Sequence, residues 1–217
     1  VGVCGLGLCS VRSWAVPLPG WGRLAWPLAA LLSSDSRLLM SELQQALEKR
    51  RHMESGAIWA SSIRPQLYLG AGRDAANLQK LREHGITHIL NVADDVPNYH
   101  EALKDELTYC NLGVADFGAD KGISRVFEDA QAFVQAVMAD AQSRCLIHCA
   151  NGSNRSATVV IALVMMLENR SLKAAYEDVK QRRAGINPLR DNRAELVQLE
   201  RRLFGQVSLW EQDVLPE

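Results

Sequence analysis

The amino-acid sequence predicts an α/β protein with a central, largely parallel mixed sheet flanked by helices. Two observations predict this fold class. Short β-rich runs alternate with helical patterns from about residue 57 onward, which is the order that βαβ units require. The chain also carries no internal repeat and no low-complexity tract that would favour another architecture. Because parallel sheets hold ligands at the carboxyl ends of their strands, functional residues are expected at those ends.

The first half of the predicted domain holds three strands and one helix. "QLYLG" indicates a short strand ended by Gly70, and "DAANLQKLREHG" indicates a helix closed by Gly85. "THILNV" follows as a buried strand. A polar stretch over residues 93–106 then leads to the strand "LTYCNLGV" and to a loop through Asp116.

The second half of the domain is mostly helical. A helix is expected over residues 123–141 because apolar side chains fall on one of its faces, namely Val126, Phe127, Ala130, Phe133, Val134 and Val137. The strand "RCLIH" and a polar loop follow. Three more helices are expected over residues 157–167, 172–182 and 189–204, the last of them entered at Pro188.

The composition is that of an ordinary globular protein. Of the 217 residues, 47% are hydrophobic and 23% are charged, with a formal net charge of -1. A nearly neutral chain argues against a nucleic-acid partner held by bulk electrostatics. The length suits one domain, which we place at residues 57–205, followed by a C-terminal tail at residues 206–217.

The first 39 residues differ from the rest of the chain. They contain no acidic residue before Asp35, and arginines and prolines interrupt every apolar run before it reaches the roughly 18 to 20 residues of a membrane span. The segment is interpreted as unstructured: either a targeting segment or sequence upstream of the true start at Met40. We favour the second interpretation. Residues 40–56 are expected to form a short, peripheral helical extension.

The five cysteines are an odd number without a paired ladder of spacings, so neither a disulfide framework nor a zinc site is expected. This usage favours a reducing compartment, the cytoplasm or the nucleus, with organelle targeting by residues 1–39 left open. Cys110 and Cys145 lie in apolar runs and are expected in the core. Cys149 instead begins a polar loop and is the candidate nucleophile.

That loop, "CANGSNRS", has the properties of a phosphate-binding site. It follows a strand and opens the apolar helix at residue 157, so the backbone N–H groups of a Gly-bearing turn and the helix dipole attract an anion. Arg155 adds a planar fork that grips two phosphate oxygens. The same field stabilises a thiolate, which makes Cys149 a nucleophile able to form a phosphocysteine.

"HCANGSNRS" resembles the signature loop of the cysteine-dependent protein tyrosine phosphatases, which reads His-Cys, five residues, Arg and then Ser or Thr. The surrounding chain, over about residues 58–204, is similar to the atypical dual-specificity subfamily through "IRPQLYLG", "GITHILNVA" and "INPLRDNRAELVQLE". The resemblance implies the dual-specificity phosphatase fold. Asn154 and Asn151 depart from the family's usual Ser and Ala.

The resemblance also implies roles for individual residues. Cys149 is the nucleophile, Arg155 the phosphate clamp, and Ser156 the hydroxyl that helps the sulfur leave. His148 either tunes the thiolate or is a buried histidine satisfied by the backbone, and these two interpretations are compatible. The phosphate is expected in the loop formed by Ala150, Asn151, Gly152, Ser153, Asn154 and Arg155. No metal and no cofactor is implied.

A general acid is expected on the loop after "YCNLGV". Asp116 in "GVADFGAD" matches the family position, although its distance to Phe127 is one residue longer than usual, which leaves Asp120 as an alternative. The acid must protonate the leaving oxygen and then, as a carboxylate, activate water against phosphocysteine.

The expected activity is hydrolysis of phosphotyrosine and phosphoserine or phosphothreonine in a protein substrate. The short domain favours a shallow site, and the loop has no Lys or Arg besides Arg155 to meet the extra phosphates of an inositol lipid. One alternative is the same mechanism on a non-protein phosphate, such as an RNA 5′ end, a glycan or a lipid. The other is a catalytically inactive phosphate-binding scaffold.

Overall fold

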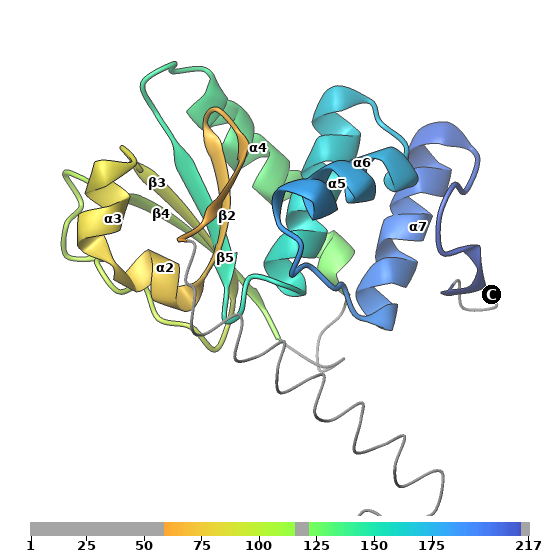
Figure 1. Ribbon diagram of the computed structural model, residues 1–217, viewed down its shortest axis with the longest axis horizontal. Helices are drawn as coiled ribbons and strands as arrows, with labels where there is room; N and C mark the ends of the chain where they lie inside the picture. Colours follow the sequence, from red (N-terminus) through yellow and green to blue (C-terminus); the bar gives the residue numbers. More distant parts are fainter. Residues whose placement is uncertain (1–58, 116–121, 214–217) are drawn as a thin grey trace, which may run out of the picture. The chain divides into compact units, whose positions relative to one another are not determined.

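A five-stranded mixed sheet forms the centre of the protein (Figure 1). The computed structural model describes residues 59–115 and 122–213, which belong to a unit that runs from Ser55 to Glu217; the expectations for residues 1–39 and 40–56 lie outside these residues. The strand order is β1-β2-β5-β3-β4. The strands are β1 (Ser61–Arg64), β2 (Leu67–Ala71), β3 (His88–Ala93), β4 (Thr108–Val114) and β5 (Cys145–Cys149).

The sheet is largely parallel, which confirms the predicted fold class. β2, β5, β3 and β4 run parallel, and only the edge strand β1 is antiparallel to its neighbour. β1 was not predicted from the sequence, because it has only four residues and a tight turn at Pro65 and Gln66 leads directly from it into β2. At the carboxyl edge Cys149 pairs with Ala71, and His148 pairs with Gly70 on β2 and Asn91 on β3.

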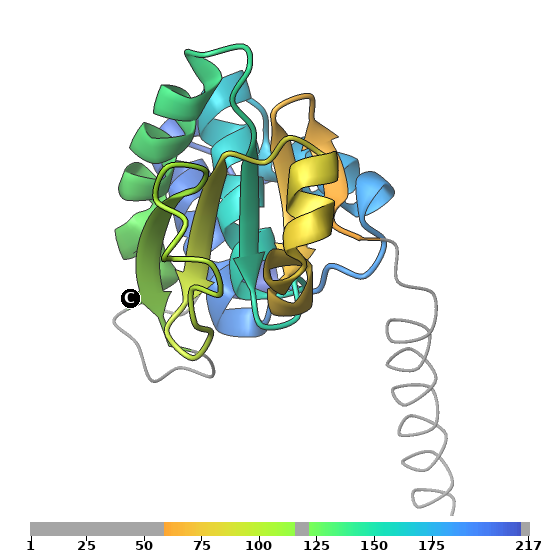
Figure 2. The same cartoon turned by 90° about the vertical axis from the view of Figure 1, so that its left-hand side faces the viewer.

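Helices cover both faces of the sheet, with α2 and α3 on one face and α4 to α7 on the other (Figures 1 and 2). Their bounds are α2 (Gly72–Ala76), α3 (Leu78–Glu83), α4 (Phe127–Met138), α5 (Arg155–Glu168), α6 (Leu172–Arg182) and α7 (Arg190–Phe204), with short 3₁₀ turns η2 (Ile123–Val126) and η3 (Glu211–Asp213). Among the described residues no helix combines the length and the apolar character of a membrane span.

The single helix predicted over residues 74–85 is wrong, because the structure has two short helices that meet at Asn77. The Asn77 side chain accepts a hydrogen bond from the backbone N–H of Lys80 at 3.0 Å. Its own backbone N–H donates to the carbonyl of Asp74 at 3.3 Å. Asparagine competes with helical hydrogen bonding in this way and favours caps, so α2 ends and α3 begins at this residue.

The helix predicted over residues 123–141 also differs from the structure at both ends. It begins as the 3₁₀ turn η2, and the regular helix α4 ends at Met138. Asp140 explains the early end, because its side chain accepts from the backbone N–H of Gln142 at 3.0 Å and from the hydroxyl of Ser143 at 2.7 Å. These bonds form a turn that leads the chain into β5.

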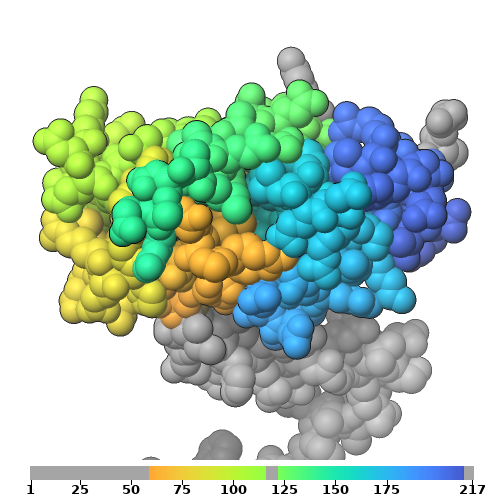
Figure 3. Space-filling model, turned by 90° about the horizontal axis from the view of Figure 1, so that it is seen from above, coloured from red at the N-terminus to blue at the C-terminus, as the bar shows by residue number. Residues whose placement is uncertain are grey.

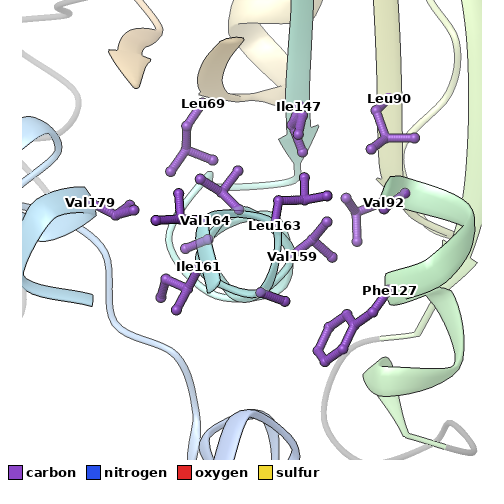
Figure 4. Close-up of a cluster of buried hydrophobic side chains, with 14 of the residues drawn as sticks. Leu69, Leu90, Val92, Phe127, Ile147, Val159, Ile161, Leu163, Val164 and Val179 are labelled. Atoms are coloured by element: carbon purple, nitrogen blue, oxygen red, sulfur yellow. The ribbon is translucent and has the colours of Figure 1, made fainter. Parts of the chain in front are cut away.

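The larger core lies between the sheet and α5, which is buried along most of its length. Figure 4 shows side chains of β2, β3 and β5 reaching α5 from the sheet, and Phe127 of α4 and Val179 of α6 closing the cluster. A helix that is apolar on all sides belongs in such a central position. α5 is therefore a fixed support for the loop at its N-terminus.

The β1–β2 hairpin lies beside α6, as the space-filling view shows (Figure 3). Arg64 of β1 makes two ion pairs there, to Glu168 and to Asp178, each at 2.6 Å. After α7 the chain turns back, and Trp210 packs edge-on against Tyr176 of α6. Val207, Leu209 and Trp210, which belong to the tail expected over residues 206–217, pack against the core.

Candidate active site

The loop between β5 and α5 lies at the carboxyl edge of the sheet. It begins at Cys149, the last residue of β5, and ends at Arg155, the first residue of α5. β5 is flanked by β2 and β3, so the segments that follow these two strands lie on either side of the loop. On the β2 side the backbone N–H of Gly72 donates to the carbonyl of Ala150 at 3.1 Å, which joins the loop to the start of α2.

The sulfur of Cys149 lies at the base of this loop and accepts two hydrogen bonds. The backbone N–H of Gly152 donates to Sγ at 3.3 Å, and the hydroxyl of Ser156 donates at 3.2 Å. Ser156 is fully buried in the first turn of α5. Two hydrogen-bond donors therefore converge on one sulfur at the base of the loop.

Gly152 is required by the shape of the loop. Its φ is +68°, a value that side chains with a Cβ atom rarely adopt. A Cβ at this position would also lie 2.4 Å from the carbonyl oxygen of Gly70 at the end of β2. Only glycine therefore allows the loop to pack against β2 while its N–H points at Cys149.

Arg155 is buried, with a side chain only 2% exposed, and it is held by groups that follow β3 and end β4. Its Nη1 donates to the carboxylate of Asp95 at 2.7 Å and to the carbonyl of Val114 at 2.9 Å. The carboxylate of Asp94 is farther away, at 3.4 Å. The hydrogen bond and the charge of Arg155 lower the pKa of Asp95.

His148 is fully buried behind Cys149, and neither of its ring nitrogens has a hydrogen-bond partner among the described residues. Burial lowers its pKa to about 4, against an opposing contribution from the backbone of Cys149. The imidazole is therefore neutral at physiological pH. Which of the two expected roles His148 has, tuning the thiolate or packing as a buried histidine, stays a prediction.

The segment between α6 and α7 and the first turn of α7 clasp the outer side of the loop with four hydrogen bonds. Arg183 donates from Nε to the carbonyl of Gly152 at 2.9 Å, and the backbone N–H of Asn187 donates to the carbonyl of Ser153 at 2.8 Å. The side-chain oxygen of Asn154 accepts the other two, from the backbone N–H of Leu189 and the side chain of Asn192, both at 2.8 Å.

This clasp explains one departure from the family's usual loop sequence. Asn154 stands where Ser is common, and its longer side chain spans the distance to the N-terminal turn of α7. Leu189 directly precedes α7, and Asn192 lies in its first turn. The amide of Asn154 therefore joins the loop to α7, where it links two segments that are far apart in the sequence.

Comparison with known proteins identifies the family. The sequence profile described as "Dual specificity phosphatase, catalytic domain" matches residues 67–202, which is more than half of the chain. The chain belongs to this family. It is 36% identical to human dual specificity protein phosphatase 9 over 141 residues, which are 65% of this chain and 36% of that protein.

Two further comparisons agree with the family assignment. The chain is 31% identical to human dual specificity protein phosphatase 6 over 207 residues, which cover 91% of this chain and 51% of that protein. It therefore spans between about a third and about a half of the length of these two relatives. The crystal structure of human DUSP28 is similar with a TM-score of 0.62 at 26% identity, covering 68% of this chain and 96% of that one.

Two residues expected to act in this dual specificity phosphatase domain lie outside the described residues. Asp116 and Asp120 fall within residues 116–121, so the choice between them as general acid stays a prediction. The described part of the chain does place the end of β4 at the loop, because the carbonyl of Val114 accepts from Arg155. The other expected site residues, from His148 to Ser156, all lie in or directly beside the loop.

The two remaining described cysteines are part of the sheet. Cys145 is fully buried, and burial raises the pKa of its thiol. Cys110 is half-buried on β4, and burial raises its pKa as well. The sheet order separates both from Cys149, since Cys145 is at the other end of β5 and β3 lies between β5 and β4. The predicted core position is confirmed for Cys145, whereas Cys110 is only partly buried.

Two side chains that support the loop, Asp95 and Arg183, were not predicted from the sequence, and neither was the burial of Asp74, which is electrostatically coupled to Arg183. A signal existed for Asp95, because "ADD" directly follows a buried strand at the carboxyl edge of a parallel sheet. Asp74 is buried and accepts from the backbone N–H of Ala71 at 2.8 Å, and burial raises its pKa while Arg183 opposes the shift. No pattern in the sequence indicated Arg183, which reaches the loop only through the position of α6.

Proposed function

We propose that this protein hydrolyses phosphate monoesters through a phosphocysteine on Cys149. The observation that carries the proposal is the pair of donors, Gly152 N–H and Ser156 hydroxyl, that point at Sγ at 3.3 and 3.2 Å. A sulfur held in this way is a nucleophile and not a packed thiol. Membership of the dual specificity phosphatase family supports the same conclusion.

In the first step the thiolate of Cys149 attacks phosphorus, so a P–S bond forms as the P–O bond to the leaving group breaks. Arg155 and the backbone N–H groups of residues 150–155 hold the three equatorial oxygens while their charge redistributes. The leaving oxygen takes a proton from Asp116, with Asp120 as the alternative donor.

In the second step water attacks the phosphocysteine, and the P–S bond breaks with both electrons returning to sulfur. The carboxylate left on the general acid takes a proton from the attacking water. The Ser156 hydroxyl donates its hydrogen bond to the leaving sulfur, and this bond strengthens as the thiolate forms. Inorganic phosphate then leaves, and the enzyme returns to its starting state.

The proposed substrates are phosphoproteins carrying phosphotyrosine, phosphoserine or phosphothreonine. The loop supports this class because Arg155 is its only cation, whereas a polyphosphorylated lipid calls for additional basic groups in the loop. The substrates and partners of the whole protein are part of this proposal, as the chain spans only part of its curated relatives.

Turnover of a generic aryl phosphate tests the proposal. Wild type is expected to release the phenol, and Cys149→Ser to lose at least about two decades of rate because a serine hydroxyl stays protonated in this loop. Cys110→Ser is the matched control, since it removes a half-buried thiol from β4, which β3 separates from β5. A wild type without turnover would instead identify a phosphate-binding scaffold.

A panel of substrates tests the substrate class. Phosphotyrosine and phosphothreonine peptides, a 5′-triphosphorylated RNA and an inositol phosphate are compared at equal concentration. The proposal expects the highest kcat/KM on the peptides. A higher value on the RNA or on the inositol phosphate would contradict a phosphoprotein phosphatase.

A further inference from the structure

Asp95 and the carbonyl of Val114 together occupy one nitrogen of Arg155. Nη1 of a guanidinium carries two hydrogens. It donates to Asp95 Oδ1 at 2.7 Å and to the Val114 carbonyl at 2.9 Å, and Asp94 Oδ1 is a longer third acceptor at 3.4 Å, so acceptors of the protein take up both hydrogens. A phosphate bound in the loop with these contacts in place must therefore be gripped by the rest of the guanidinium and not by Nη1.

Asp95 is itself held by the turn that follows β3. The side chain of Asn91, which is 2% exposed, accepts from the backbone N–H of Ala93 at 3.1 Å and donates to the carbonyl of Val96 at 2.7 Å. These two bonds lie on either side of Asp95 in the chain. The backbone N–H of Asp94 also donates to the carbonyl of Val114 at 3.2 Å, so the turn after β3 is joined to the end of β4.

Arg155 is therefore fixed from outside the loop by two neighbouring strands. Its backbone begins α5, while its Nη1 is bound to residues that follow β3 and end β4. A planar guanidinium with one nitrogen fixed cannot rotate freely about its long axis. The orientation of its remaining N–H groups is set before any phosphate arrives, which lowers the entropic cost of binding one.

We propose that Asp95 is a positioning residue that sets the rotation of the Arg155 guanidinium for phosphate binding. This inference rests on the proposed function, because Arg155 is the phosphate clamp of that mechanism. Asp95 does not touch the substrate in this account. It acts through Arg155 alone.

The opposite account treats Asp95 as a competitor whose carboxylate occupies the place of a phosphate oxygen. Removal of the Asp95 carboxylate changes the affinity for an anion in opposite directions in the two cases. Removing a negative charge near an anion site tightens anion binding by charge alone. If Asp95 positions Arg155, its removal weakens anion binding despite this favourable change in charge.

Asp94 provides a matched control for the charge. Its side chain is 48% exposed and that of Asp95 is 55% exposed, and both carboxylates follow β3. A strong charge-assisted hydrogen bond has a length of about 2.7 to 2.9 Å. The carboxylate of Asp95 is 2.7 Å from Nη1 and meets this criterion, whereas that of Asp94 is 3.4 Å away and does not. Asp94→Ala therefore removes the same charge and leaves the short bond in place.

Calorimetric titration with tungstate, an oxyanion that mimics phosphate, is the primary test. Asp95→Ala is expected to weaken tungstate binding about tenfold or more, as expected for the loss of a hydrogen bond between charged groups. Asp95→Asn keeps an acceptor oxygen without the charge and is expected to show a smaller loss. Asp94→Ala is expected to bind tungstate as tightly as wild type or slightly more tightly. Tighter or unchanged binding by Asp95→Ala, or equal losses in the Asp94 and Asp95 variants, would overturn the proposal.

Kinetics separate positioning from a purely structural role. The expected loss in kcat/KM for Asp95→Ala is the same for aryl phosphates with good and with poor leaving groups, because Arg155 holds the phosphate and not the leaving oxygen. If Asp95→Ala melts at a much lower temperature than wild type, Asp95→Asn carries the test, since it preserves the shape of the side chain. A wild type that binds tungstate without turning over aryl phosphate would contradict the proposed function and leave the positioning role testable by titration.

Discussion

The hydroxyl of Ser156 lies 3.2 Å from the sulfur of Cys149 and donates a hydrogen bond to it. Both residues are buried, and they are seven positions apart, on either side of the phosphate-binding loop. A neutral donor at this place stabilises a departing thiolate more than it stabilises a sulfur already bonded to phosphorus. Its largest effect is therefore expected in the second chemical step.

Ser156→Ala is expected to slow the hydrolysis of phosphocysteine by about tenfold to a hundredfold and to slow its formation less, because the N–H of Gly152 still donates to Sγ. Rapid-mixing experiments with an aryl phosphate then show a burst of phenol close to one equivalent of enzyme, followed by slow turnover. Ser156→Thr, which keeps the hydroxyl, is the control. Loss of the burst itself in Ser156→Ala would place the hydroxyl in the first step.

Asp116→Ala is expected to slow turnover of substrates with poor leaving groups more than of substrates with good ones, since only the former need a proton. The measurement is the slope of log kcat/KM against leaving-group pKa for a series of aryl phosphates. Asp120→Ala is the comparison and is expected to keep the wild-type slope. The assignment is wrong if Asp120→Ala steepens the slope and Asp116→Ala does not.

His148 predicts a pH dependence of stability. Its pKa of about 4 in the folded state lies below the ordinary value of 6.5, so between these values the unfolded chain binds a proton that the folded protein does not. The free energy of unfolding therefore falls as the pH falls from 6.5 to 4 and is fully regained above 6.5. The contribution of this residue is about 3 kcal/mol.

Denaturant unfolding of His148→Gln at several pH values measures that contribution. Between pH 4 and 6.5, the free energy of unfolding of the variant is expected to depend on pH much less than that of wild type, whatever the stability of the variant at neutral pH. His88→Gln is the control, because His88 is only half-buried, and Asp140 opposes the lowering of its pKa by burial. Equal pH dependence in wild type and His148→Gln would exclude a neutral, buried His148.

Much of the site could be predicted because its main parts are consecutive in the sequence. One apolar strand, one polar loop and one apolar helix follow each other from Cys145 to Glu168, so the position of Cys149, Arg155 and Ser156 follows from local rules. The alternation of strands and helices along the chain was also enough to predict a largely parallel sheet. β1, the break at Asn77 and the two ends of the helix predicted over residues 123–141 were missed, and all of them depend on turns and caps of a few residues.

The residues that support the loop could not be found in this way. Asp95 reaches Arg155 across 60 positions of the chain, and Arg183 reaches Gly152 across 31. Such contacts depend on which strands are neighbours and on how α6 packs, and a single sequence does not determine either. The depth of a residue in the fold has the same limit, since nothing local in the sequence indicates that the His148 side chain is fully buried.

The clasp between the loop and α7 gives a further prediction. Asn154→Ala removes the acceptor of both Leu189 N–H and the Asn192 side chain, and the expected loss is about 1 kcal/mol of unfolding free energy. Asn192→Ala is expected to lower the unfolding free energy by less, because it removes only one of these two hydrogen bonds. A double-mutant cycle measured by denaturant unfolding is expected to show that the two losses do not add. Strict additivity would show that the two side chains do not act together.

Acid-quenched mass spectrometry of Ser156→Ala during turnover of an aryl phosphate tests the central claim most directly. The slow second step of this variant lets the intermediate accumulate, so a phosphoryl group is expected on the peptide that contains Cys149. Cys149→Ser run in parallel is expected to carry none. A phosphoryl group on another residue, or turnover by Ser156→Ala with none on Cys149, would contradict nucleophilic catalysis by this cysteine.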